Sequence, residues 1–153
     1  MTQYSIREAI EMAVQTEKIG SRFYEDMAEK FKQDFELREF FSLMARKEHV
    51  HEQKFTELKD MVGEREPDEW AQVAEYMRAY VESAFFLGKD KATVHMQNIN
   101  DLRAAVSYAI AFEKETLLYY HGIRDFVKEK EIMDEIIREE RSHILWLAKY
   151  RNR

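Results

Sequence analysis

The segment Lys47-Glu48-His49-Val50-His51-Glu52 places five charged or ionisable side chains within six residues, in the middle of a long predicted helix. Such a run usually forms a solvated helix face. Here, however, Glu48 and His51 fall on the apolar seam of a helix predicted over about residues 34–63, with Asp34 as its cap. The seam recurs at helical spacing and consists of Leu37, Phe41, Met44, Phe55, Leu58 and Val62. The segment therefore predicts two ionisable side chains that point into a helical core.

Three further stretches carry a seam of the same kind. A helix over about residues 5–33 begins at Ser5, where Glu8 stands three residues on and completes a capping box. Two more helices are predicted over about 101–128 and about 130–151. Each seam is apolar except near its middle, and the polar or ionisable seam residues there are Glu17, Tyr24, Glu113, Thr116, Tyr120, Glu140 and His143.

The second pair of helices repeats the first pair. The seam of the third helix is that of the first shifted by 96 residues, so that Glu113 corresponds to Glu17. The fourth helix is the second shifted by 92 residues, and Glu140 and His143 then correspond to Glu48 and His51. The sequence therefore predicts two related helix hairpins.

The connection over about residues 64–100 is too long for a turn and has a helical pattern of its own. Pro67 stands at its predicted start, and one face carries Trp70, Val73, Met77, Tyr80 and Ala84. A helix of about 20 residues spans roughly 30 Å, the length of a bundle. We predict a crossover there, while residues 89–99 fit no single pattern. The predicted fold is an all-α four-helix bundle with a long helical crossover, in one domain over residues 1–153.

Composition supports this fold and excludes several classes of protein. Four glycines and one proline among 153 residues favour long helices. The net charge of −6 argues against a nucleic-acid partner. Since there is no cysteine, disulfides and thiolate metal sites are excluded. No leader and no apolar run of membrane-spanning length stands out, so we expect a soluble, cytoplasmic protein.

The six ionisable seam residues are expected to meet at one level of the bundle. In an antiparallel hairpin, side chains at one height are equidistant from the turn, and Glu17 and Glu48 are centred on residues 32 and 33. Glu113 and Glu140 are centred on residues 126 and 127, close to the second predicted turn. Buried carboxylates need a counter-charge. Two divalent ions would balance four carboxylates and two neutral imidazoles, and these oxygen and nitrogen ligands suit iron or manganese, with zinc as another possibility.

On these residues the sequence resembles the rubrerythrin branch of the ferritin-like superfamily, over the whole chain except the crossover. The motifs that carry the resemblance are Glu17, Glu48-His49-Val50-His51, Glu113 and Glu140-Arg141-Ser142-His143. The resemblance implies a di-iron oxidoreductase that reduces peroxide or O2, and a homodimer. It also implies bridging carboxylates at Glu48 and Glu140, terminal ones at Glu17 and Glu113, and ligand-contacting tyrosines at Tyr24 and Tyr120.

The sequence departs from the family pattern in two places. Thr116 stands where the type members carry a further glutamate one turn after the first on the third helix, and Glu115 lies about 100° away around that helix. A cysteine-rich rubredoxin domain is also missing, so we expect electrons to come from an external redox partner.

Other interpretations of the same residues remain open. The site could serve iron handling, as a ferroxidase or metal buffer, or could be a structural metal site in a non-enzymatic helical module. The six residues could also be a chance polar core, and the two tyrosines ordinary core residues. Several ionisable residues are expected outside the site, on the solvated face or in local contacts, namely His49, Glu52, His95, His121 and Glu139.

Overall fold

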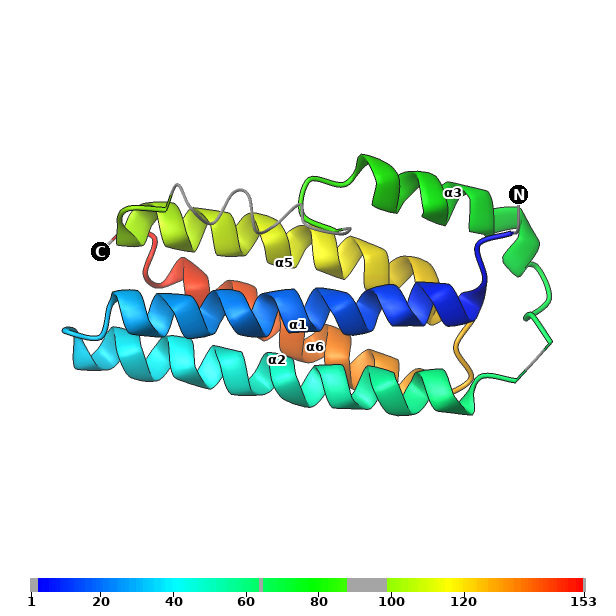
Figure 1. The fold of residues 1–153 in the computed structure, drawn as a ribbon, viewed down its shortest axis with the longest axis horizontal. Helices are drawn as coiled ribbons and strands as arrows, with labels where there is room; N and C mark the ends of the chain where they lie inside the picture. Colours follow the sequence, from blue (N-terminus) through cyan, green and yellow to red (C-terminus); the bar gives the residue numbers. More distant parts are fainter. Residues whose placement is uncertain (1–2, 64, 88–98, 153) are drawn as a thin grey trace.

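A computed structural model describes residues 3–63, 65–87 and 99–152, and in these ranges the secondary structure is entirely helical. Figure 1 shows α1 and α2 as one antiparallel pair and α5 and α6 as a second pair beside it. The predicted all-α four-helix bundle with a crossover is confirmed. The helices are α1 (Ile6–Lys30), α2 (Phe35–Met61), α3 (Trp70–Ser83), α5 (Leu102–Arg124) and α6 (Lys130–Ala148).

The predicted starts of α1, α2 and α5 are confirmed by their caps. At the start of α1, Ser5 Oγ accepts the backbone N–H of Glu8 at 2.9 Å, and Glu8 Oε1 accepts that of Ser5 at 3.4 Å. The Asp34 and Asp101 carboxylates each accept the backbone N–H three residues on, at 3.1 and 2.7 Å, and so cap α2 and α5. These side chains satisfy amides that have no partner inside the helix.

The helices end earlier than the sequence predicts. They end at Lys30, Met61, Arg124 and Ala148, whereas the apolar pattern suggested about 33, 63, 128 and 151. The difference arises because apolar residues continue past the last helical turn. Val127, for example, lies in the turn between α5 and α6 and is still buried.

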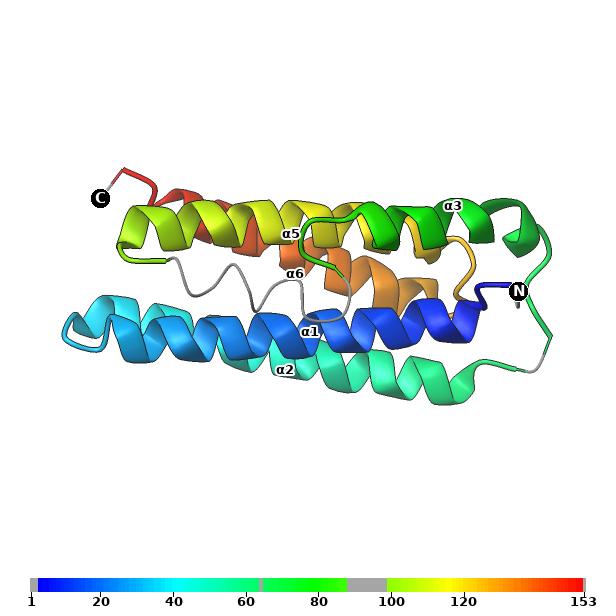
Figure 2. The ribbon, with the colours of Figure 1, turned by 45° about the horizontal axis from the view of Figure 1, so that its top comes forward.

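The crossover helix α3 packs against α1 and α5 and is shorter than predicted. Figures 1 and 2 both show it alongside the end of the bundle that holds the N-terminus. Helix α3 begins at Trp70 and not near Pro67, because the Pro67 carbonyl accepts the N–H of Trp70 in a turn and Glu69 has a left-handed φ of 70°.

The buried face of α3 is also rotated from the predicted one. Its buried residues are Trp70, Ala74, Met77 and Val81, while Val73, Tyr80 and Ala84 are half-buried. The indole N–H of Trp70 donates to the Tyr4 carbonyl at 2.7 Å. Of the segment 89–99, residues 89–98 lie outside the described residues.

Two apolar clusters fill the bundle, one toward each end. The cluster at the α3 end includes Ile10, Phe55, Tyr120 and Met133, and the cluster at the other end includes Met27, Phe41, Val106 and Leu147. Along every one of the four long helices, the ionisable seam residues fall between the two clusters. The fold therefore holds one polar layer inside an otherwise apolar core. Within the described ranges, every helix is too short or too polar to cross a lipid bilayer.

Candidate metal centre

The six predicted side chains come together in this polar layer. Each of them is at most 1% exposed, and they come from all four long helices: Glu17, Glu48, His51, Glu113, Glu140 and His143. They form two overlapping groups, Glu17–Glu48–His51–Glu140 and Glu48–Glu113–Glu140–His143. In each group one ligand atom per residue lies within 4.8 Å of the others, and Glu48 and Glu140 belong to both groups. This is the arrangement of two neighbouring cation positions that share two carboxylates.

Both imidazole rings turn Nδ1 toward the carboxylates. His51 Nδ1 lies 2.8 Å from Glu140 Oε1 and 3.7 Å from Glu17 Oε1. His143 Nδ1 lies 3.0 Å from Glu48 Oε1, 3.2 Å from Glu140 Oε2 and 3.4 Å from Glu113 Oε1. The rings are nearly parallel, with centroids 5.9 Å apart. The two histidines thus face each other across the shared glutamates.

Two buried tyrosines hold the outer carboxylates. Tyr24 on α1 donates to Glu113 Oε1 on α5 at 2.7 Å, and Tyr120 on α5 donates to Glu17 Oε1 on α1 at 2.6 Å. Each tyrosine therefore bonds the glutamate of the opposite helix. Burial and the neighbouring carboxylates raise the pKa of both phenols well above the ordinary value, so they are hydrogen-bond donors at neutral pH. The expected contact between these tyrosines and the carboxylates is present.

The histidines are positively charged when no cation occupies the layer. Burial by itself would lower the pKa of His51, but the carboxylates of Glu17 and Glu140 raise it to about 11. In the same way, burial opposes the charge on His143, while Glu140 and Glu113 raise its pKa to about 11. Each imidazolium is thus stabilised by the carboxylates that surround it.

The four carboxyl groups divide into two kinds. Burial and the neighbouring carboxylates raise the pKa of Glu48 well above its ordinary value and that of Glu113 to about 8. Burial also opposes ionisation of Glu17 and Glu140, but hydrogen bonds and the adjacent imidazolium groups lower the pKa of both. At neutral pH two carboxylates therefore balance two imidazolium ions, and the other two carboxyls stay neutral.

The layer is incompletely satisfied by protein groups alone. Buried atoms without a hydrogen-bond partner within the described part of the chain include Glu17 Oε2, both oxygens of Glu48, Glu113 Oε2, Glu140 Oε2 and both ring nitrogens of His143. An unpaired buried polar atom costs about 1–3 kcal/mol. So many unpaired oxygen and nitrogen atoms around one point indicate a cation site, and the four carboxylates and two imidazoles, once deprotonated, fit two divalent ions in charge and donor type.

Gly20 makes room for one shared glutamate. A Cβ at this position would lie 2.6 Å from Glu48 Oε2 and 3.3 Å from the Phe112 ring. The internal repeat places Thr116 at the equivalent position of α5, where its buried Oγ1 has no hydrogen-bond partner among the described residues. The Glu48 carboxylate can therefore lie this close to α1 only because residue 20 is a glycine.

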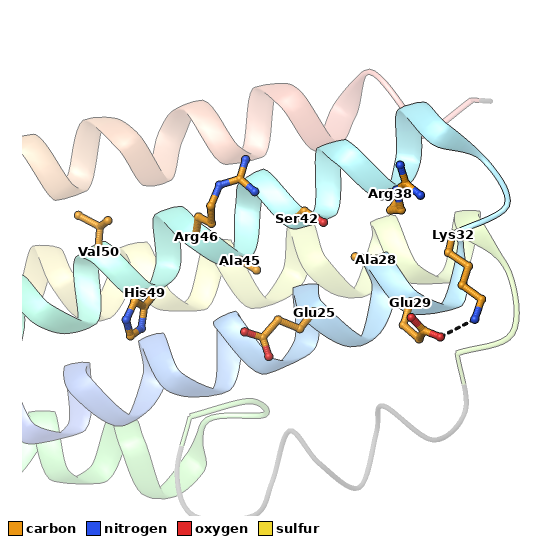
Figure 3. Close-up of a pocket in the computed structure, with 10 residues that line it drawn as sticks. All are labelled: Glu25, Ala28, Glu29, Lys32, Arg38, Ser42, Ala45, Arg46, His49 and Val50. Atoms are coloured by element: carbon orange, nitrogen blue, oxygen red, sulfur yellow. Dashed lines mark hydrogen bonds and ion pairs between the residues drawn. The ribbon is translucent and has the colours of Figure 1, made fainter.

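The residues around a surface groove do not belong to this layer. A cavity of about 750 Å³ lies between α1 and α2, and Figure 3 shows Glu25, Arg46 and His49 on its walls. None of the six buried residues lines it. His49 and His121 are exposed, as the sequence predicted, and His95 lies outside the described residues. Glu52 was expected to be solvated, but its side chain is only 18% exposed and lies 3.2 Å from His49 Nδ1.

The contact between Glu139 and His51 was not predicted from the sequence. Glu139 was assigned to the solvated face, but its Oε2 lies 2.6 Å from His51 Nε2, and its side chain is only 33% exposed. Glu139 borders the seam without belonging to it. Its contact with His51 depends on how closely α2 and α6 approach, which the periodicity of one helix does not show.

The comparisons with known proteins agree with this geometry. The family model described as Rubrerythrin matches residues 8–150. A solved structure from Thermotoga maritima, described as a candidate ferritin-like diiron-carboxylate protein, superposes with a TM-score of 0.71 at 19% sequence identity. The match covers 99% of this chain and 97% of that one, and at this identity it shows a shared fold. No curated protein matches the sequence. Because the family match spans almost the whole chain, the protein belongs to the rubrerythrin family.

Proposed function

We propose that the polar layer binds two iron ions and that the protein uses them to reduce peroxide or O2 with electrons from an external donor. The observation that carries this proposal is the pair of overlapping four-residue groups that share Glu48 and Glu140. Membership of the rubrerythrin family supports the binding of two metal ions. The ligands are oxygen and nitrogen atoms, and the sequence has no cysteine thiolate, which favours iron or manganese over an ion that prefers sulfur.

Each residue of the layer has a defined part in holding the ions. Glu48 and Glu140 belong to both groups and would be shared by the two ions, while Glu17 with His51 would complete one position. Glu113 with His143 would complete the other. Two ferrous ions held here would supply the two electrons that convert one peroxide and two protons to water.

The surrounding residues prepare the layer for this chemistry. The phenol groups of Tyr24 and Tyr120 fix the two outer carboxylates, so that these oxygens do not have to be reoriented when an ion binds. Apolar clusters on both sides keep bulk water away from the carboxylates. The proposal assigns the electrons for repeated turnover to an external redox partner.

The experiment is a stopped-flow measurement on the metal-free protein loaded anaerobically with Fe(II). Mixing with hydrogen peroxide or with O2 should give a rapid ultraviolet absorbance rise as Fe(III) forms. The double variant Glu48→Gln with Glu140→Gln should abolish it, while Glu57→Gln, at an exposed position of α2, should leave it unchanged. Absence of a reaction with both oxidants would overturn the proposed activity.

A second candidate function is iron handling, in which ferrous iron is oxidised or buffered without repeated reduction of an oxidant. The observation that favours it is Thr116, a buried hydroxyl in place of the additional carboxylate that the rubrerythrin type members carry. Retention of several irons beyond two per chain would support this role. Multiple-turnover peroxide consumption with a reductase would contradict it.

The homodimer and the cytoplasmic location stay predictions. Sedimentation equilibrium of the purified protein should give twice the mass of one chain. If the protein were a non-enzymatic helical module, the variant Glu48→Gln with Glu140→Gln would still bind its partner.

A further inference from the structure

The two halves of the metal centre differ in what lies behind each histidine. On one side, His51 Nε2 lies 2.6 Å from the Glu139 carboxylate. The internal repeat shifts α6 positions by 92 residues relative to α2, so that the residue equivalent to Glu139 is Lys47. The two halves therefore carry opposite charges at equivalent places.

The second histidine lacks the support that the first one has. His143 Nε2 is buried and has no hydrogen-bond partner among the described residues. Its ring packs against Trp146, with centroids 5.6 Å apart, and Lys47 Nζ lies 5.8 Å from the centroid of the same indole ring. An aromatic ring that carries a cation thus packs against His143, whereas a carboxylate contacts His51.

The Glu139 carboxylate also fixes the orientation of the His51 ring. Because Nε2 donates to Glu139, the lone pair of the neutral ring lies on Nδ1, which faces Glu140 and Glu17 at 2.8 and 3.7 Å. A carboxylate behind a metal-binding histidine holds the ring in place and increases its basicity, and loss of such a partner typically lowers metal affinity by about 10- to 100-fold.

We infer that the two metal positions are unequal, that the position of Glu17 and His51 fills first and binds its ion more tightly, and that Glu139 is the positioning residue responsible. This inference rests on the proposed two-metal function. The negative charge of Glu139, in contact with His51, attracts a cation to the first position, whereas the equivalent place in the second half carries the positive charge of Lys47.

The experiment is a calorimetric titration of the metal-free protein with Co(II), which needs no redox turnover. The wild-type protein should show two separate binding steps. Crystals grown with one equivalent of Co(II) should give an anomalous peak between Glu17 and His51, and a much weaker one between Glu113 and His143.

Substitutions assign the asymmetry to its cause. Glu139→Gln keeps an oxygen that can accept the His51 N–H but removes the charge, and it should weaken the first step by roughly 10-fold or more while leaving the second unchanged. Glu135→Gln removes the same charge one turn earlier on α6, where the carboxylate pairs with Lys54, and should change neither step. Lys47→Glu should tighten the second step.

Each possible result decides the question. Two steps, a weakened first step in Glu139→Gln and an unchanged Glu135→Gln would support the inference. Two ions that bind with equal affinity, or a Glu139→Gln variant with both steps unchanged, would overturn it while leaving the proposed function intact. A wild-type protein that takes up no Co(II) would overturn both.

Discussion

Loading the metal-free protein with two divalent ions at pH 7 should release about four protons per chain. Metal ligands must be deprotonated, so each ligand that carries a proton in the metal-free state gives it up on binding. Two protons come from His51 and His143, whose pKa values are about 11. Two more come from Glu48 and Glu113, whose pKa values are raised well above the ordinary value and to about 8, respectively.

The same four protons fix how metal affinity depends on pH. Near neutral pH the overall constant for binding two ions should rise by about 10,000-fold for each unit of pH. Above pH 8 the Glu113 carboxyl is already ionised in the metal-free protein, and the release should fall to about three protons. The pH dependence should therefore become less steep between pH 7 and pH 9.

The assay is calorimetry with Zn(II) in several buffers of different ionisation enthalpy, from which the number of released protons is obtained. Glu48→Gln removes one protonated ligand and should lower the release at pH 7 to about three. Release of one proton or none by the wild-type protein would refute the reasoning, because it would mean that the four carboxyls and two imidazoles are not protonated as described.

Three further predictions follow from individual contacts. The free energy of unfolding of the metal-free protein, measured in urea, should fall between pH 5 and pH 9, because the raised pKa of Glu113 gives a stabilisation that is present below pH 4.5 and lost as the pH passes about 8. Gly20→Ala should raise or preserve thermal stability, since alanine is favoured over glycine in a helix by about 1 kcal/mol. The same variant should weaken metal binding in calorimetry, because the new Cβ would lie 2.6 Å from Glu48 Oε2 and this oxygen would have to move. Tyr120→Phe should lower the free energy of unfolding in urea by about 1–3 kcal/mol, because Glu17 Oε1 loses its hydrogen-bond donor.

Matched controls separate these effects from general disturbance. Gly63→Ala places a Cβ where nothing lies within 4 Å and should leave metal binding unchanged. Tyr150→Phe removes a hydrogen bond to the exposed Glu36 and should cost less stability than Tyr120→Phe. A free energy of unfolding that rises with pH would contradict the first prediction, and normal metal binding by Gly20→Ala would contradict the second. An equal loss of unfolding free energy in Tyr120→Phe and Tyr150→Phe would contradict the third.

The periodic part of the site was predictable from sequence. Because Glu48 and His51 interrupt an apolar seam and Glu140 and His143 do so at repeat-related positions, their burial follows from helical spacing alone. The fact that Glu48 and His51 share one level with Glu17 follows from the turn at Asp34. The structure bears out these placements, since all five side chains are at most 1% exposed.

Contacts that depend on how helices approach one another were not predictable. Glu139 lies beside the seam, and whether its carboxylate reaches His51 depends on the separation of α2 and α6. The same limit applies to α3, where the predicted face included Tyr80 while the buried face includes Ala74. A short helix that packs against α1 and α5 can rotate by a fraction of a turn and still bury Trp70.

Helix ends were overestimated for a related physical reason. Residues after the last helical turn, such as Phe31 and Val127, still contribute apolar side chains to the core. Periodicity alone therefore extends the helix through residues that already form the turn.

The central claim is that the buried polar layer is a site for two metal ions, and the most direct test is the metal content of purified protein combined with anomalous scattering at the iron edge. Our account predicts two iron ions per chain, both located between the carboxylates of Glu48 and Glu140. A crystal of iron-loaded protein with no anomalous density in this layer, or with metal bound only at the surface, would contradict it.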